Sequence, residues 1–181
     1  MSSHEIQIIP TSGSTGARVE GLDLRKPIDD ALRTKLHDAF LAHTVLVFPH
    51  QKISTDEYLE FGRLWGELMK GELMLHPLFR PVDGYPEIIP VINRGKARAV
   101  AEHWHADITF VEHPPIGSIL YGVEVPPAGG DTQFANQYLA YEALSEGMKE
   151  LLDGRRALFE GSVARPPSPA RTRRRRRSIR W

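Results

Sequence analysis

The sequence predicts an α+β fold, with one domain of helices and strands followed by a short basic tail. Helical spacing dominates the early part of the chain and β-like runs dominate the later part, without the strand–helix–strand alternation of a doubly wound parallel sheet. A length of 181 residues suits one ordinary domain, and 41% hydrophobic with 25% charged residues is a globular composition. The chain has no cysteine, so any metal site must use nitrogen and oxygen ligands.

The first elements are predicted by changes in hydrophobic spacing. Glu5–Ile9 has the composition of a strand, and the glycine-rich residues 11–21 predict turns. From residue 29 to about 42 apolar residues recur at helical intervals, with two aspartates where negative charge favours a helix start. The β-branched run 44–48 then predicts a buried strand.

The next elements rest on a capping signal and on short apolar runs. Ser54 and Glu57 form a capping-box pattern, which predicts a second helix over about 55–65. Residues 66–86 are rich in Pro and Gly and predict a long irregular connection, and long loops often carry function. Further strands are expected at residues 87–92, 103–110, 116–125 and 132–134, followed by one or two helices over 137–152.

Charge divides the chain at about residue 164. Residues 1–164 hold all 23 acidic residues and 15 of the 23 Lys and Arg, a net charge of −8, whereas residues 165–181 hold eight Arg and no acid. This Arg/Pro-rich tail lacks the apolar residues needed to pack, so we expect disorder there. The charge of this tail leaves open the alternative that the protein binds nucleic acid through it. The acidic domain 1–164 argues against nucleic acid as a partner. Without a leader pattern or a long apolar span, we expect a cytoplasmic protein with no membrane partner.

The stretch "EHWHADITF" places two imidazoles and a carboxylate at alternate positions. In a strand, His105 and Asp107 would point to one face about 6.6 Å apart, close enough to share a metal ion, whereas His103 would lie too far from Asp107. A third ligand would have to come from elsewhere. Two imidazoles and one carboxylate suit non-haem Fe(II), zinc accepts a similar set, and a polar patch on a strand is the plain alternative.

Several longer motifs carry a resemblance to a known family. "GLDLRKPI", "LAHTVLVFPHQ", "FGRLWGEL", "HPLF", "HWHADITF", "PPIGSILYGVEVPPAGGDTQFAN" and "AYEALSEGMKELLDG" occur in the order and near the spacing of the taurine dioxygenase/2,4-D dioxygenase (TauD/TfdA) family. The resemblance spans roughly residues 5–160. It implies an Fe(II)- and 2-oxoglutarate-dependent dioxygenase built on a double-stranded β-helix (jelly roll) with flanking helices, incomplete in this chain.

The resemblance implies roles for individual residues. His105 and Asp107 take the place of the first two iron ligands, and Thr132 of "GGDT" that of a hydroxyl that helps to hold 2-oxoglutarate. His76 of "HPLF" corresponds to a substrate-side histidine. The implied reaction consumes O2 and 2-oxoglutarate, hydroxylates a small organic acid, and releases succinate and CO2.

Two positions bear on the substrate. Where the taurine enzymes carry a tyrosine after the "HP" pair this chain has Phe79, and where they carry an asparagine before the "WHxD" tryptophan it has Ala101. Both changes remove polar substrate contacts. The resemblance therefore implies a less polar substrate than taurine, such as an alkyl sulfate, an aryloxyacid or another small acid.

The family pattern is not complete in this chain. The family places a second iron-ligating histidine and a 2-oxoglutarate-binding arginine downstream, yet no histidine follows His113 and the Arg-rich tail begins at residue 165. We therefore expect a truncated or out-of-frame ending, with a catalytically inactive remnant or a binding subunit as the alternative function. Unpaired strand edges would favour association into a homo-oligomer.

Overall fold

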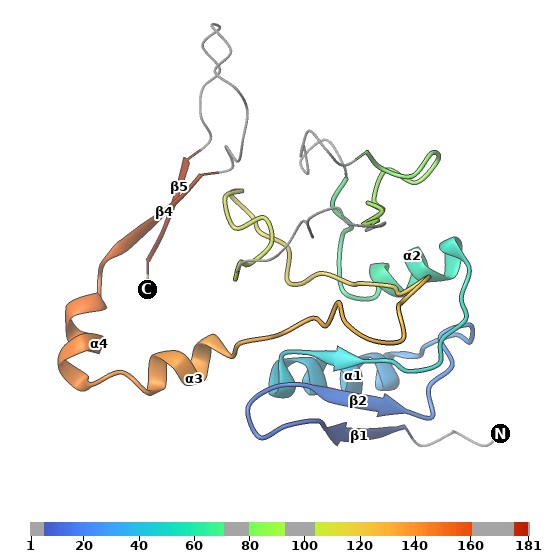
Figure 1. Cartoon of the computed structure of the whole chain (residues 1–181), viewed down its shortest axis with the longest axis horizontal. Coiled ribbons are helices and arrows are strands. Elements are labelled where there is room, and N and C mark those ends of the chain that lie inside the picture. The colour runs from blue at the N-terminus through green and yellow to red at the C-terminus, as the bar shows by residue number, and fades with distance from the viewer. Residues whose placement is uncertain (1–5, 71–79, 93–103, 161–175, 181) are drawn as a thin grey trace, which may run out of the picture. The chain divides into compact units, whose positions relative to one another are not determined.

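The computed structural model describes residues 6–70, 80–92, 104–160 and 176–180, which form helices and two small sheets (Figure 1). The chain divides into two compact units, Met1–Gly66 with Tyr121–Glu150 and Glu67–Leu120 with Leu151–Trp181. The α+β class is confirmed, whereas the finer jelly-roll expectation is not confirmed by these two sheets. No helix in the described ranges is long and apolar enough to cross a membrane.

A three-stranded sheet opens the first unit. Strand β1 (Gln7–Pro10) pairs antiparallel with β2 (Ala17–Glu20), and β2 pairs in parallel with the two-residue β3 (Leu46–Val47). The predicted first strand is confirmed, and β2 lies within the stretch that was expected to be only turns. The predicted buried strand 44–48 is wrong in extent and burial, because β3 keeps two residues and Val47 is 45% exposed.

Helix α1 (Asp30–His43) runs along one face of this sheet (Figure 1). It begins where predicted because the Asp29 carboxylate accepts a hydrogen bond from the Leu32 amide at 2.8 Å, and it ends at Thr44 in the left-handed conformation. Its buried face supplies Leu36, only 2% exposed, which packs with Ile6 and Val19. Apolar burial between sheet and helix therefore forms the core of this unit.

Helix α2 (Thr55–Arg63) has the predicted capping box. The Glu57 amide donates to Ser54 Oγ at 3.2 Å, and the Ser54 amide donates to Glu57 Oε2 at 2.6 Å. Edge-to-face aromatic contacts extend the core beyond this helix, with centroids 5.1 Å apart for Phe48–Phe61 and 5.5 Å apart for Phe40–Trp65. The two helices and the sheet thus form one packed body.

The loop before α2 is fixed by the side chain of Gln51. Its amide nitrogen donates to the carbonyls of Leu22 and Pro49, both at 2.9 Å, and its oxygen accepts from the Leu24 amide at 3.1 Å. The Tyr121 hydroxyl accepts from the Ile53 amide at 3.3 Å and approaches the Gln51 carbonyl oxygen at 3.4 Å. Residues from both stretches of the first unit therefore meet at this loop.

Two short helices follow later in the chain, as predicted for residues 137–152. Helix α3 (Gln137–Glu142) is capped by Asn136, whose amide nitrogen also donates to the Ser14 carbonyl at 2.6 Å. Helix α4 (Glu146–Leu152) places Lys149 within 3.1 Å of Glu146 and 3.5 Å of Glu142. Neither helix has a buried residue, so they add little to the core.

The second unit contains an antiparallel pair of strands, β4 (Arg156–Glu160) and β5 (Arg176–Arg180). Strand β5 belongs to the tail 165–181, where the sequence favoured disorder. Its pairing runs from Arg156 opposite Arg180 to Glu160 opposite Arg176. Backbone pairing with β4, which charge and composition do not reveal, accounts for order in these five residues.

The strands predicted at 87–92, 116–125 and 132–134 are wrong. These residues have irregular backbone in the structure, apart from bends and turns. A strand requires a neighbour that accepts and donates its backbone hydrogen bonds, and within the described residues no strand pairs with these runs. Apolar spacing alone was therefore not sufficient to make them strands.

Candidate metal site

The segment that carries the candidate ligands is a turn and not the predicted strand. Residues 104–106 have irregular backbone, and residues 107–110 form turns. Ile108 has a φ of 50°, a left-handed conformation that β-branched residues rarely adopt. The alternation that predicted a strand over 103–110 was misleading, because no neighbouring strand in the described residues pairs with the segment.

The turn brings the two predicted ligands together by another route. His105 Nε2 lies 3.5 Å from Asp107 Oδ1, with the side chains 55% and 52% exposed. In an extended strand the two side chains would stand about 6.6 Å apart. That figure is the spacing of the two positions along a strand, whereas the 3.5 Å joins the ends of the two side chains, which meet here at a turn.

This separation of 3.5 Å is close to that between two ligand atoms of one metal ion. Donor atoms that are each about 2.1 Å from an ion and about 90–110° apart as seen from it lie roughly 3.0–3.4 Å from each other. An imidazole nitrogen and a carboxylate oxygen are also a donor set that iron and zinc accept. The pair thus fits two adjacent positions of a metal site.

A third protein ligand is not found in the described part of the chain. There, no three or more His, Asp or Glu side chains gather in a way that could hold a metal. His113 is among the described residues and does not complete the pair. His76 and His103 lie outside the described residues, as do the predicted substrate contacts Phe79 and Ala101.

A serine that the sequence reading did not single out contacts the carboxylate. Ser118 Oγ donates a hydrogen bond to Asp107 Oδ2 at 2.7 Å, and both residues belong to the second unit. The available signal was the one serine in the apolar run "IGSILY". A serine in such a run does not by itself predict a contact with Asp107, because the contact depends on the path of the backbone between the two residues.

The predicted 2-oxoglutarate residue lies in the other compact unit. Thr132 is exposed on irregular backbone between Asp131 and the cap of α3, and the short strand predicted around it is absent. Its role in binding 2-oxoglutarate stays a prediction.

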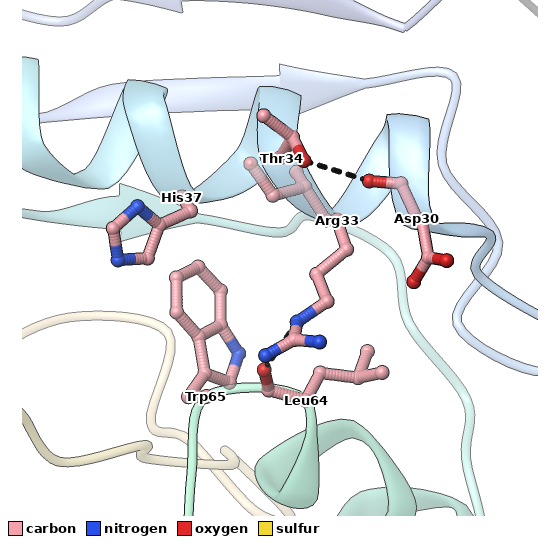
Figure 2. Close-up of a pocket in the computed structure, with 7 residues that line it drawn as sticks. Asp30, Arg33, Thr34, His37, Leu64 and Trp65 are labelled. Atoms are coloured by element: carbon pink, nitrogen blue, oxygen red, sulfur yellow. Dashed lines mark hydrogen bonds between the residues drawn. The ribbon is translucent and has the colours of Figure 1, made fainter.

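The first unit also contains a pocket of about 400 Å³ between α1 and the end of α2. Arg33 Nε donates to the Leu64 carbonyl at 3.0 Å across this pocket, and Thr34 Oγ1 donates to the Asp30 carbonyl at 2.8 Å (Figure 2). Among the described residues the buried Trp65 Nε1 has no hydrogen-bond partner. The lining residues are Asp30, Arg33, Thr34, Leu36, His37, Leu64 and Trp65.

Comparison with known proteins adds information that the geometry alone does not contain. The model of the "Taurine catabolism dioxygenase TauD, TfdA family" matches residues 7–180. The family match therefore extends into β5, whereas the motifs of the sequence analysis carried the resemblance only to about residue 160.

Individual relatives agree with this match. An alkylsulfatase of Acinetobacter baylyi is 35% identical over 152 residues, covering 83% of this chain and 46% of its own length. An alpha-ketoglutarate-dependent sulfate ester dioxygenase of Pseudomonas putida is 35% identical over 150 residues, with 82% and 48% covered. The crystal structure of a taurine dioxygenase from Burkholderia xenovorans superimposes with a TM-score of 0.72 at 36% identity, over 84% of this chain and 52% of that one. The chain thus spans about half the length of the relatives it matches.

Proposed function

This chain belongs to the taurine catabolism dioxygenase TauD, TfdA family, and from that premise we propose that it forms part of an Fe(II)- and 2-oxoglutarate-dependent dioxygenase. The observation that carries the proposal is the 3.5 Å approach of His105 Nε2 to Asp107 Oδ1. It supports two adjacent ligand positions in the segment where the family motif occurs.

In this proposal each residue binds or orients a group. His105 and Asp107 hold Fe(II), and the Thr132 hydroxyl hydrogen-bonds 2-oxoglutarate. Bound iron would supply the oxidation chemistry, in which O2 and 2-oxoglutarate give a hydroxylated substrate, succinate and CO2. Because the described residues provide two ligands, a third protein ligand must join them from elsewhere.

The proposed substrate is a small organic acid less polar than taurine, of the alkyl sulfate or aryloxyacid class. Two of the matched relatives bear names that refer to sulfate esters. The chain also has Phe79 and Ala101 at the positions where the family's taurine enzymes carry polar side chains. His76 is the proposed substrate-side histidine.

We further propose that the helices and the small sheets are the N-terminal part of a jelly roll. Support comes from the likeness to the taurine dioxygenase structure, with a TM-score of 0.72 over 84% of this chain. A jelly roll closes two sheets around its site, and closure would cover the half-exposed ligand pair. This part of the proposal predicts that the complete fold excludes water from the metal.

The proposed function is tested by anaerobic titration of the purified chain with Fe(II) in the presence of 2-oxoglutarate. Chelation of 2-oxoglutarate by the bound iron is expected to give a visible charge-transfer absorption band with a stoichiometric endpoint. His105→Ala and Asp107→Ala should each abolish the band. His113→Ala is the matched control, because this histidine is described and lies outside the pair.

The outcomes divide clearly. A band that disappears in both ligand variants and persists in His113→Ala supports the iron site. A band that persists in both ligand variants would place the iron elsewhere, and the absence of any band would show that this chain does not hold iron and 2-oxoglutarate together.

A further inference from the structure

We propose that Ser118 is a positioning residue that selects which oxygen of Asp107 faces the metal. Its hydroxyl donates to Asp107 Oδ2 at 2.7 Å, a distance typical of a hydrogen bond from a hydroxyl to a carboxylate. The other oxygen, Oδ1, is the one that lies 3.5 Å from His105 Nε2. The two carboxylate oxygens are therefore already assigned to different partners.

This division of the carboxylate has a consequence for coordination. A carboxylate can bind a metal through one oxygen or through both. Because Oδ2 accepts the hydrogen bond from Ser118, Oδ1 is the oxygen left to bind the metal beside the imidazole of His105. Ser118 thus favours coordination through one oxygen and leaves an additional position of the ion available to other ligands.

The need for such a residue follows from exposure. Asp107 is 52% exposed, so without a hydrogen bond its carboxylate would rotate in water and lose the orientation toward His105. A hydrogen bond to a ligating carboxylate fixes the ligand before the metal arrives, and loss of such contacts commonly lowers metal affinity by about 10–100-fold. Because Ser118 is itself exposed, we expect an effect at the lower end of that range.

The backbone explains how a residue eleven positions away reaches the carboxylate. The turn at 107–110 includes the left-handed Ile108, and Val111 just after it is buried, 7% exposed. The chain then continues through Pro114 and Pro115, which cannot donate backbone hydrogen bonds and restrict its path. Strain at Ile108 next to a proposed ligand is consistent with a site that surrounding contacts hold in place.

This inference rests on the proposed function, and its test reads metal affinity and not turnover. The full chain is titrated with Co(II) at fixed pH, and the dissociation constant is taken from the visible absorption of the bound ion. Ser118→Val is expected to raise the dissociation constant about 10-fold. Threonine has nearly the same shape as valine but keeps a hydroxyl. Ser118→Thr should therefore give a dissociation constant within about 3-fold of that of the unsubstituted chain.

Two additional variants separate the inference from the function on which it rests. Asp107→Ala removes the proposed ligand, and Ser14→Ala removes an exposed hydroxyl of the first unit as a matched control. The inference is supported when Asp107→Ala and Ser118→Val both weaken Co(II) binding, while Ser118→Thr and Ser14→Ala do not.

The remaining outcomes overturn either one proposal or both. If Asp107→Ala weakens binding and Ser118→Val does not, the positioning role is wrong and the metal site stands. An equal loss of Co(II) affinity in Ser118→Val and Ser118→Thr would also overturn the positioning role, because the hydroxyl would then make no difference. If Asp107→Ala has no effect, or if the unsubstituted chain does not bind Co(II), both the metal site and the role of Ser118 fail.

Discussion

Residues 6–65 and residues 104–120 differ in what holds them in place. The first region combines a sheet with two capped helices and contains almost all of the apolar side chains that are buried among the described residues. The second has irregular backbone and turns, with Val111 as its buried apolar residue, yet it contains both proposed ligands. Stability therefore resides mainly in one region and the proposed chemistry in the other.

The comparison teaches what a metal ion would contribute. A region with little apolar burial is ordered by its polar contacts, here the approach of His105 to Asp107 and the hydrogen bond from Ser118. Metal binding to a site that is incompletely ordered beforehand contributes to folding free energy. The second region should thus depend on metal for its order, whereas the first should not.

The largest expected effect compares one residue type in the two regions. Leu36→Ala removes a side chain that is 2% exposed in the core with Ile6 and Val19, and we expect a loss of about 2–5 kcal/mol in the free energy of unfolding. Leu120→Ala removes a side chain that is 75% exposed, so the expected change is within about 0.5 kcal/mol. Urea denaturation followed by circular dichroism measures both.

A large loss in Leu120→Ala would break the comparison, because it would show that residues around the site are buried in solution, for example by a second copy of the chain. A small loss in Leu36→Ala would mean that the sheet and helix do not pack as described.

The second prediction concerns the loop that connects β1 and β2. Gly16 has a φ of 90°, and an added Cβ would lie 2.5 Å from Thr11 Oγ1. Gly16→Ala should therefore cost about 1–3 kcal/mol of unfolding free energy. Gly13→Ala in the same loop is the control, because nothing lies within 4 Å of its added Cβ. Similar losses in the two variants would indicate that the loop is not closed as described.

The elements that the sequence predicted well were those with local signals. The aspartates near residue 29 and the Ser54–Glu57 capping box are signals within one turn of the chain, and both helices begin within a residue of where these signals place them. The antiparallel β2 was missed, because its pairing with β1 was hidden by the glycines around it. Local chemistry thus fixed the helix starts but not the pairing partners.

The candidate metal site was likewise predicted only in part from the sequence. The spacing of His105 and Asp107 predicted that they could share a metal, and the structure brings them to 3.5 Å, although through a turn and not a strand. The contact with Ser118 spans eleven residues and depends on the path of the backbone between them. Residue types therefore indicated the proposed ligands, whereas the serine that contacts one of them was found only in the structure.

The third prediction tests the capping box of α2. Ser54→Ala removes the acceptor of the Glu57 amide hydrogen bond, and we expect a loss of about 1 kcal/mol in unfolding free energy. Glu57→Gln keeps an oxygen that can accept from the Ser54 amide, so its cost should be smaller. A cost of Ser54→Ala no greater than that of Glu57→Gln would argue against the reciprocal cap and would weaken the contrast between the two regions.

The smallest expected effect is the acid sensitivity of the first region. The hydrogen bonds from Arg25 lower the pKa of Asp23 from 3.8 to about 2, and the Ser54 amide lowers the pKa of Glu57. Because both carboxylates bind protons more weakly in the folded chain, their contribution is present above the unfolded values and is lost as pH falls, between 3.8 and about 2 for Asp23. Denaturation at a series of pH values should give a shallower acid decline for Asp23→Asn than for the unsubstituted chain. Both carboxylates remain partly open to solvent, so the difference should be small. Parallel declines would show that the pair of Asp23 with Arg25 does not persist in solution.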